Sequence, residues 1–164
     1  MTGKTRDYTD RQVDLEFLQT VVKPEGVIPL SITATNGATR RVAGIQKAIQ
    51  RYVSLLLTTS ASAPFMFRIS NTLLGELRAG TVSDKGYLRH LFNMANAAAL
   101  DTLRKDDYNT DRFGVQKDDE RIDSVELSGV TLDYATSTLG LSLVIRTAAG
   151  SDYSYVVPVS TRQD

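Results

Sequence analysis

The chain contains no cysteine and a single histidine, His90. Without cysteine it can form neither a disulfide framework nor a thiolate metal site, and one histidine cannot build a histidine metal cluster. The absence of cysteine suits synthesis in a reducing cytoplasm. We therefore expect a protein that works without a metal or other cofactor.

An excess of charge of one sign is also missing, because 19 basic side chains balance 19 acidic ones. Nucleic-acid-binding domains usually carry a basic surface that attracts phosphates, so we expect neither DNA nor RNA as a partner. No apolar run approaches the roughly 20 residues that a membrane-spanning helix needs, and the first residues are polar, unlike a secretory signal. We therefore do not expect the protein to be secreted or to bind a membrane.

The remaining composition is that of an ordinary folded domain. Hydrophobic residues make up 41% and charged residues 23% of the 164 positions, which is typical of globular proteins. A chain of this length buries roughly two thirds of the surface that it exposes when unfolded. One hydrophobic core is therefore expected.

The first half of the chain is predicted to be mainly helical. Apolar residues recur at helical spacing between positions 42 and 56, and the polar side chains, Lys47 and Gln50 among them, occupy the opposite face. The apolar positions of this helix are Val42, Ile45, Ile49, Tyr52, Val53 and Leu56. A short helix is expected over residues 71–77. Asp84 is placed to cap a longer helix that ends near Lys105, with His90 as a partly buried packing residue.

Two further elements are expected before residue 41. Residues 10–22 show apolar positions at near-helical spacing and predict a short helix. Residues 27–35 alternate apolar and polar side chains and predict a strand, which ends at an Asn36-Gly37 turn. Pro29 lacks an amide proton, so this strand should lie at a sheet edge.

From Ile122 onward the hydrophobic period changes to two, which predicts strands. A first run changes phase at Gly129, consistent with a bulge, and two further alternating runs follow. Pro158 lies in the last run, where an edge position would spare the ladder a missing donor. The alternating positions of the last two runs are Leu139, Leu141, Leu143 and Ile145, then Tyr153, Tyr155, Val157 and Val159.

These patterns together predict an α+β fold. An N-terminal helical half should pack on a C-terminal antiparallel sheet of three to four strands. We assign residues 1–41 to an N-terminal extension and residues 42–164 to a single domain.

Catalytic machinery is not evident in the sequence. His90 has no recognisable partners for serine-type catalysis, and no glycine-rich phosphate-binding motif occurs. The acidic residues could form a carboxylate pair for glycoside hydrolysis, but Asp118, Asp119 and Glu120 sit in a polar loop that should leave them solvated and ionised. We therefore predict no catalytic, cofactor-binding or metal-binding residues. The other candidate acids are Glu76, Asp84 and Asp101.

Two segments resemble a known protein family. Residues 44–58 read Gly-Ile-Gln-Lys-Ala-Ile-Gln-Arg-Tyr-Val-Ser-Leu-Leu-Leu-Thr. They resemble the opening helix of the baseplate wedge and sheath-initiator family of contractile phage tails, also labelled tail-lysozyme-like. The following Phe65-Met66-Phe67-Arg68 and Leu73-Leu74-Gly75 are similar to the family's aromatic segment and short helix. Asp119-Glu120-Arg121-Ile122 resembles the family's Glu-Pro-Arg-Ile signature, although the proline is absent here. The resemblance covers residues 42–159.

The resemblance implies a structural protein of the virion, located in the tail baseplate after assembly in the host cytoplasm. Such a subunit is present in about six copies around the tail tube, as expected of a closed ring. It would bind baseplate wedge proteins through Glu120, Arg121, Lys47 and Gln50, and the tail tube is a further candidate partner. Its terminal sheet would accept arms of the tail sheath protein by β-augmentation. The sheath-binding edge strand would contain Tyr153, Tyr155, Val157 and Val159, although the same tyrosines could equally form the inward face of the sheet.

Two alternatives remain open at this point. The family's lysozyme label and the available acids, Glu76 and Glu120 among them, allow a peptidoglycan hydrolase acting through paired carboxylates. A ring-forming neck or tail-completion adaptor is a third reading. Of these, the non-enzymatic baseplate component is our preferred hypothesis.

Overall fold

The computed structural model describes residues 14–15, 34–35, 38–39, 41–58, 72–110, 117–133 and 137–160. These form an α+β fold, as the sequence predicted, with three helices and a three-stranded antiparallel sheet. The helices are α1 (Ile45–Leu57), α2 (Leu73–Ala79) and α3 (Lys85–Thr110), and a 3-10 turn, η1 (Asp118–Glu120), leads into the strands β5 (Ile122–Asp133), β6 (Thr138–Thr147) and β7 (Asp152–Ser160). Within the described ranges, no helix is both long and apolar enough to cross a membrane.

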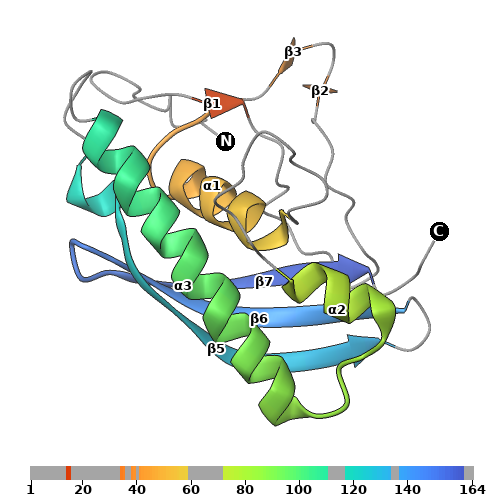
Figure 1. Ribbon diagram of the computed structural model, residues 1–164. Coiled ribbons are helices and arrows are strands. Elements are labelled where there is room, and N and C mark those ends of the chain that lie inside the picture. Colours follow the sequence, from red (N-terminus) through yellow and green to blue (C-terminus); the bar gives the residue numbers. More distant parts are fainter. Residues whose placement is uncertain are drawn as a thin grey trace.

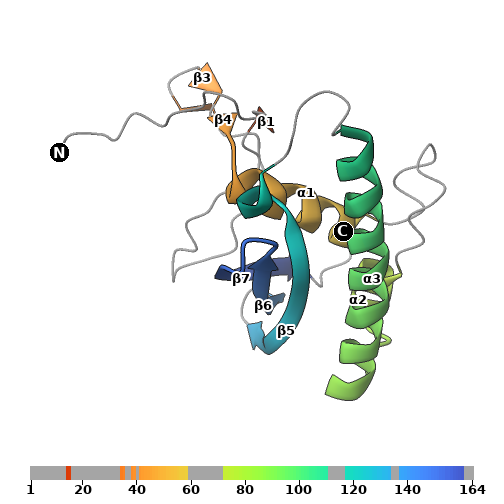
Figure 2. The same cartoon turned by 90° about the vertical axis from the view of Figure 1, so that its left-hand side faces the viewer.

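The sheet forms one layer and the helices the other (Figure 1). In Figure 2, which turns the view by 90°, α2 and α3 stand on one side of the sheet and α1 lies across its upper part, on the side of β7. No described helix or strand covers the opposite face. The molecule therefore has an inner sheet face under the helices and an outer face without a described cover.

Short strand pairs lie near the start of the chain. Strand β1 (Asp14–Leu15) pairs with β4 (Arg41–Val42), and β2 (Ala34–Thr35) pairs with β3 (Ala38–Thr39). The predicted helix over residues 10–22 is therefore wrong at Asp14 and Leu15, where cross-strand pairing overrides a weak helical pattern. The end of the predicted 27–35 strand is confirmed at Ala34 and Thr35. The rest of that strand, Pro29 and the Asn36-Gly37 turn lie outside the described residues, as do residues 59–71 with their aromatic motif.

Helix α1 confirms the predicted amphipathic helix, with a later start. Val42 pairs in β4, and the helix begins only after Gly44, whose φ of 67° is accessible at low cost to glycine. The apolar stripe faces the core, with Tyr52 and Leu56 fully buried. Gln50, expected on the polar face, is also buried, with 1% of its surface exposed.

Helix α3 is capped as its sequence indicates. The Asp84 Oδ1 accepts a hydrogen bond from the backbone N–H of Tyr87 at 2.8 Å, which satisfies a donor that the first turn leaves unpaired. The helix continues to Thr110, five residues beyond the predicted end at Lys105. His90 is exposed, which corrects its predicted role as a partly buried packing residue.

The sheet has the order β5-β6-β7, and its register places the alternating apolar residues on the inner face. The register of β5 against β6 shifts between Leu127 and Gly129, which confirms the bulge predicted at Gly129. The central strand β6 is the most deeply covered. Its inner-face residues are Leu139, Leu141, Leu143 and Ile145, of which none exposes more than 7% of its surface.

A chain of hydrogen bonds ties α1, α3 and β5 together. The hydroxyl of Tyr52 donates to the Asn96 Oδ1 at 2.8 Å, and the Asn96 Nδ2 donates to the backbone carbonyl of Val125 at 2.9 Å. Burial raises the pKa of the Tyr52 phenol, so this hydroxyl remains a neutral donor. One amide side chain thus fixes two elements that are far apart in the sequence.

Replacing Asn96 tests how much this connection stabilises the fold. The Asn96→Ala substitution leaves the Tyr52 hydroxyl and the Val125 carbonyl without their partner, and we expect the free energy of unfolding to fall by about 1–3 kcal/mol. Urea unfolding followed by circular dichroism measures this loss. Met94→Ala, on the same helix at a side chain that is 59% exposed, is the matched control and should change stability by less than about 0.5 kcal/mol. Equal effects of both substitutions would contradict the assignment.

Candidate functional site

Strand β7 pairs with β6 along one of its edges. The candidate site is its other edge, which pairs with no described strand. The backbone N–H of Thr147 bonds the carbonyl of Ser151 at 3.0 Å, at the start of the β6–β7 ladder. Hydrogen-bonded and non-hydrogen-bonded pairs alternate along an antiparallel ladder. Odd-numbered residues of β7 therefore direct their backbone groups toward β6, and even-numbered residues direct theirs to the open edge.

This alternation identifies the backbone groups that a guest strand would meet. Ser154 and Val156 present an N–H and a carbonyl at the edge, whereas Pro158, in the same phase, presents only a carbonyl. Both Ser154 and Val156 are exposed. The expectation that Pro158 lies on an edge strand is confirmed, and its missing donor falls on the open side. Strand addition with full bonding is thus restricted to the part of β7 before Pro158.

The four predicted edge residues of β7 point their side chains to the inner face. Their cross-strand partners are buried residues of β6, with Leu143 opposite Tyr155 and Ile145 opposite Tyr153. Val157 and Val159 are buried at 1% and 3% exposure and belong to the core. Tyr153 is 36% exposed, Tyr155 is partly buried, and burial raises the pKa of the Tyr155 phenol. The tyrosine half of the strand thus offers accessible side chains, while the valine half holds the fold together.

Sequence reasoning missed Val156, which lies on the outer face and is 36% exposed. It pairs with Ser142, and the neighbouring Pro158 pairs with Gly140. An apolar residue out of phase with the alternating tyrosines and valines was the available signal. A guest strand on β7 would have Val156 and Pro158 beside it on the outer face.

The four predicted wedge-binding residues fall into two groups. Lys47 and Arg121 are partly exposed, whereas Gln50 and Glu120 are buried, the latter with 4% exposure. Helix α1 and the 3-10 turn η1, which carry the buried pair, contact each other. The solvated setting expected for Glu120 is therefore wrong, because α1 packs against the turn that contains it.

The candidate acids are dispersed over different elements. The Glu76 carboxylate accepts a hydrogen bond from the Thr81 hydroxyl, Asp84 caps α3, and Asp101 forms an ion pair with Lys105 within α3. Glu120 lies on η1. Within the described ranges, no three His, Cys, Asp or Glu side chains form a group that could hold a metal ion.

The chain matches no protein family, no curated protein and no solved structure.

A partly buried ion pair joins α1 to the second half of α3. The Arg51 Nη1 lies 3.1 Å from the Asp107 Oδ1, and the Arg51 Nη2 lies 3.5 Å from the Asp106 Oδ2. Asp107 is 7% exposed. Burial raises the pKa of the Asp107 carboxyl above its usual range, and this effect exceeds the lowering by Arg51. The pair holds the two helices together while its carboxylate remains costly to ionise.

The stability of the fold should consequently depend on the ionisation of Asp107. The unfolded chain releases this proton at about pH 4, and the folded chain releases it at higher pH. The free energy of unfolding should therefore fall as pH rises through the interval between these two values. Asp107→Asn lacks this titration, so its stability relative to the parent chain should increase across the same interval. Urea unfolding at a series of pH values measures the difference.

Asp106→Asn provides the control, because it makes the same substitution at the neighbouring Arg51 contact, where the Asp106 side chain is 53% exposed. Its stability difference from the parent chain should change less with pH. A relative stability of Asp107→Asn that decreases with pH would show that Arg51 outweighs burial.

Proposed function

We propose that this chain is a non-enzymatic assembly protein of a contractile tail baseplate. In this proposal the open edge of β7 accepts an arm of the tail sheath protein, and the helical half binds a baseplate wedge protein. The observation that carries the proposal is the second edge of β7, where Ser154 and Val156 present backbone groups without a described partner strand. The motif resemblance of α1 and of the segment before β5 supplies the identity of the guest.

The register of β7 limits how the arm would bind. The arm would pair with residues 152–156, since Pro158 supplies no amide donor toward the open side. Tyr153 and Tyr155 lie on the inner face of the sheet, so the inner side chains of the arm would pack beside them. Backbone hydrogen bonds would then supply affinity, and the alternating side chains would supply register.

The helical half offers a separate surface for the wedge protein. Lys47 and Arg121 are partly exposed and are the residues that we propose for direct contact. Gln50 and Glu120 are buried, so their proposed role is to hold α1 and η1 in place behind that surface. Virion localisation, a ring of about six copies and contact with the tail tube are parts of the same proposal.

A proline at the open edge tests strand addition on β7. Ser154→Pro removes one amide donor from the open side, in the same phase as Pro158, and leaves the donors directed at β6 in place. We expect recruitment of the sheath protein encoded in the same genome to weaken at least about fivefold. One backbone hydrogen bond is lost, and the added ring obstructs pairing. Affinity capture with the tagged chain measures this recruitment.

Ser154→Ala is the matched control, because it changes the same side chain and retains the amide. It should recruit sheath protein as the parent chain does. Wedge binding should be unchanged in both variants, and circular dichroism should give the same fold. Full recruitment by Ser154→Pro would contradict the proposed edge, and capture of neck proteins instead of wedge and sheath proteins would favour the adaptor.

The peptidoglycan hydrolase predicts a different result. Purified chain should leave a cell-wall suspension turbid if the protein is not an enzyme. Clearing of the suspension that is lost in Glu76→Gln or Glu120→Gln would overturn the proposed structural role.

A further inference from the structure

Strand β5 forms the other edge of the sheet, opposite β7. Among the described residues, side chains of α3 are bonded to backbone groups along one part of this edge and not along another. The Arg104 Nη2 donates to the carbonyl of Asp123 at 3.0 Å, and the Asn96 Nδ2 donates to the carbonyl of Val125 at 2.9 Å. Both carbonyls therefore point away from β6, and side chains of α3 occupy them. Side chains that cover an edge in this way obstruct the addition of another strand.

Beyond Val125 the described structure has no such closure. Alternation along the ladder directs the backbone N–H and carbonyl of Leu127 away from β6, to the same edge. The bulge shifts the register by one residue, so beyond it the backbone groups of Val130 and Leu132 point to this edge. In both views α3 runs beside β5 in the opposite direction (Figures 1 and 2), so the first turns of α3 face this part of the strand. The described residues therefore leave this edge without a partner where the helix begins.

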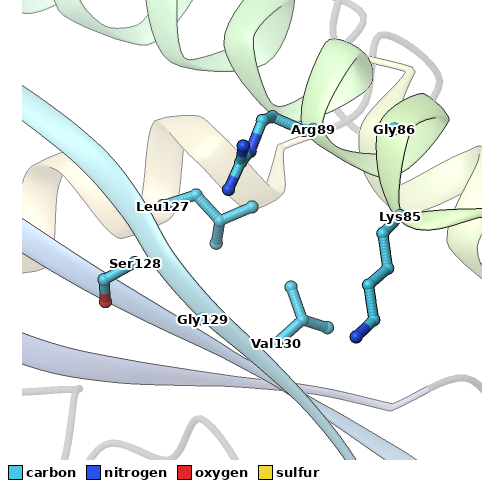
Figure 3. A pocket seen from close by; sticks show the side chains of 7 residues that line it. All are labelled: Lys85, Gly86, Arg89, Leu127, Ser128, Gly129 and Val130. Carbon is cyan, nitrogen blue, oxygen red and sulfur yellow. The ribbon is translucent and has the colours of Figure 1, made fainter.

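A cavity of about 360 Å³ lies between the first turns of α3 and the bulge of β5. Figure 3 shows the side chains of Lys85 and Arg89 reaching from α3 toward β5, above Leu127 and Val130. The lining also includes Gly86, Ser128 and Gly129. The cavity thus combines an apolar floor with two cationic side chains on one wall.

The two cations are not used by the rest of the described structure. The side chains of Lys85 and Arg89 have neither an ion-pair nor a hydrogen-bond partner among the described residues, although Asp84 is adjacent in sequence to Lys85. The Oδ1 of Asp84 is engaged by the N–H of Tyr87. Within the described part of β5, the acidic side chains of Asp123, Glu126 and Asp133 are not among the lining residues. Both charged residues in the lining of the groove are therefore basic.

We propose that this groove binds an extended acidic segment of a partner protein, which adds to the open edge of β5 at Leu127, Val130 and Leu132. Spacing as well as charge favours a strand as the guest. Lys85 and Arg89 are four residues apart on a helix, a rise of about 6 Å. Alternate residues on one face of a strand are about 6.6–6.8 Å apart. Two acidic residues at positions i and i+2 of the guest match the two cations.

The proposed groove is distinct from the β7 edge and does not rest on the proposed baseplate function. The guest's acidic side chains would lie on the inner face, with their stems over Leu127 and Val130 and their carboxylates at Lys85 and Arg89. The backbone of the guest would hydrogen-bond to the groups of β5 beyond Val125, as the side chains of α3 do at Asp123 and Val125. The closed part of the edge would limit how far the guest extends toward Asp123.

A synthetic peptide with the sequence Thr-Val-Glu-Val-Glu-Val-Thr, labelled with a fluorophore, tests this proposal on the full chain. Fluorescence anisotropy should show saturable binding that weakens at least tenfold in the Lys85→Gln, Arg89→Gln double variant. The peptide with glutamine in place of both glutamates should bind at least tenfold more weakly to the parent chain. Lys105→Gln removes one positive charge from the same helix outside the groove and should leave binding unchanged.

Charge reversal gives a positive readout that misfolding cannot imitate. The Lys85→Glu, Arg89→Glu variant should bind the peptide with lysine in place of both glutamates and should lose the acidic one. In the parent chain, amide hydrogen exchange at Leu127, Val130 and Leu132 should slow when the acidic peptide binds, because strand addition protects these groups.

Other outcomes would overturn the proposal. Displacement of the peptide by inorganic phosphate at equal concentration, without amide protection, would identify a site for small anions. A dimer of the chain alone that is lost in the double glutamine variant would assign the groove to a second copy. Equal binding of the acidic and glutamine peptides would remove the role of Lys85 and Arg89. None of these results depends on sheath recruitment at β7, so the two proposals stand or fall separately.

Discussion

Burial of the inner face of β6 is the constraint on which the rest of the structure depends. Leu141, Leu143 and Ile145 are almost completely covered, with 0–1% exposure, and each is flanked by a paired residue on β5 and on β7. A one-residue slip of either neighbour would turn its apolar side chains to the outer face. The register of all three strands, and with it the phase of both edges, follows from the covering of this central strand.

The phase of the edges decides where another chain can add. On β7, the side chains of Tyr153, Tyr155, Val157 and Val159 lie on the inner face. Ser154 and Val156 alternate with them and direct their backbone groups to the open edge. On β5, the same rule exposes Leu127, Val130 and Leu132, after α3 has occupied the carbonyls of Asp123 and Val125. Exposed edges tend to be protected in native proteins. Here the protection is partial: α3 side chains on β5 and a proline on β7.

Helix α3 connects the two halves of the fold. Its Asn96 joins α1 to β5, its Asp107 receives Arg51 from α1, and its first turns carry the cations of the groove. Burial of Gln50 and Glu120 belongs to the same packing, because α1 and η1 contact each other beside α3. Polar residues that look solvated along the chain are thus enclosed where elements from distant parts of the sequence meet.

The sequence by itself determined the order of elements in the domain, because hydrophobic period is a local property that each segment carries alone. The stripe of α1, the Asp84 cap and the bulge at Gly129 were all readable in this way, as was the edge position of Pro158. It failed at Asp14 and Leu15, at Gln50, at Glu120 and at His90, where exposure or pairing depends on what other segments bring. Only the tertiary structure decided which backbone groups of β5 are closed. A carbonyl is hydrogen-bonded at such an edge only when a side chain from a distant segment reaches it. No local pattern predicts that Asn96 bonds Val125 and that Arg104 bonds Asp123. Nor does one predict that Lys85 and Arg89 lie beside the groove.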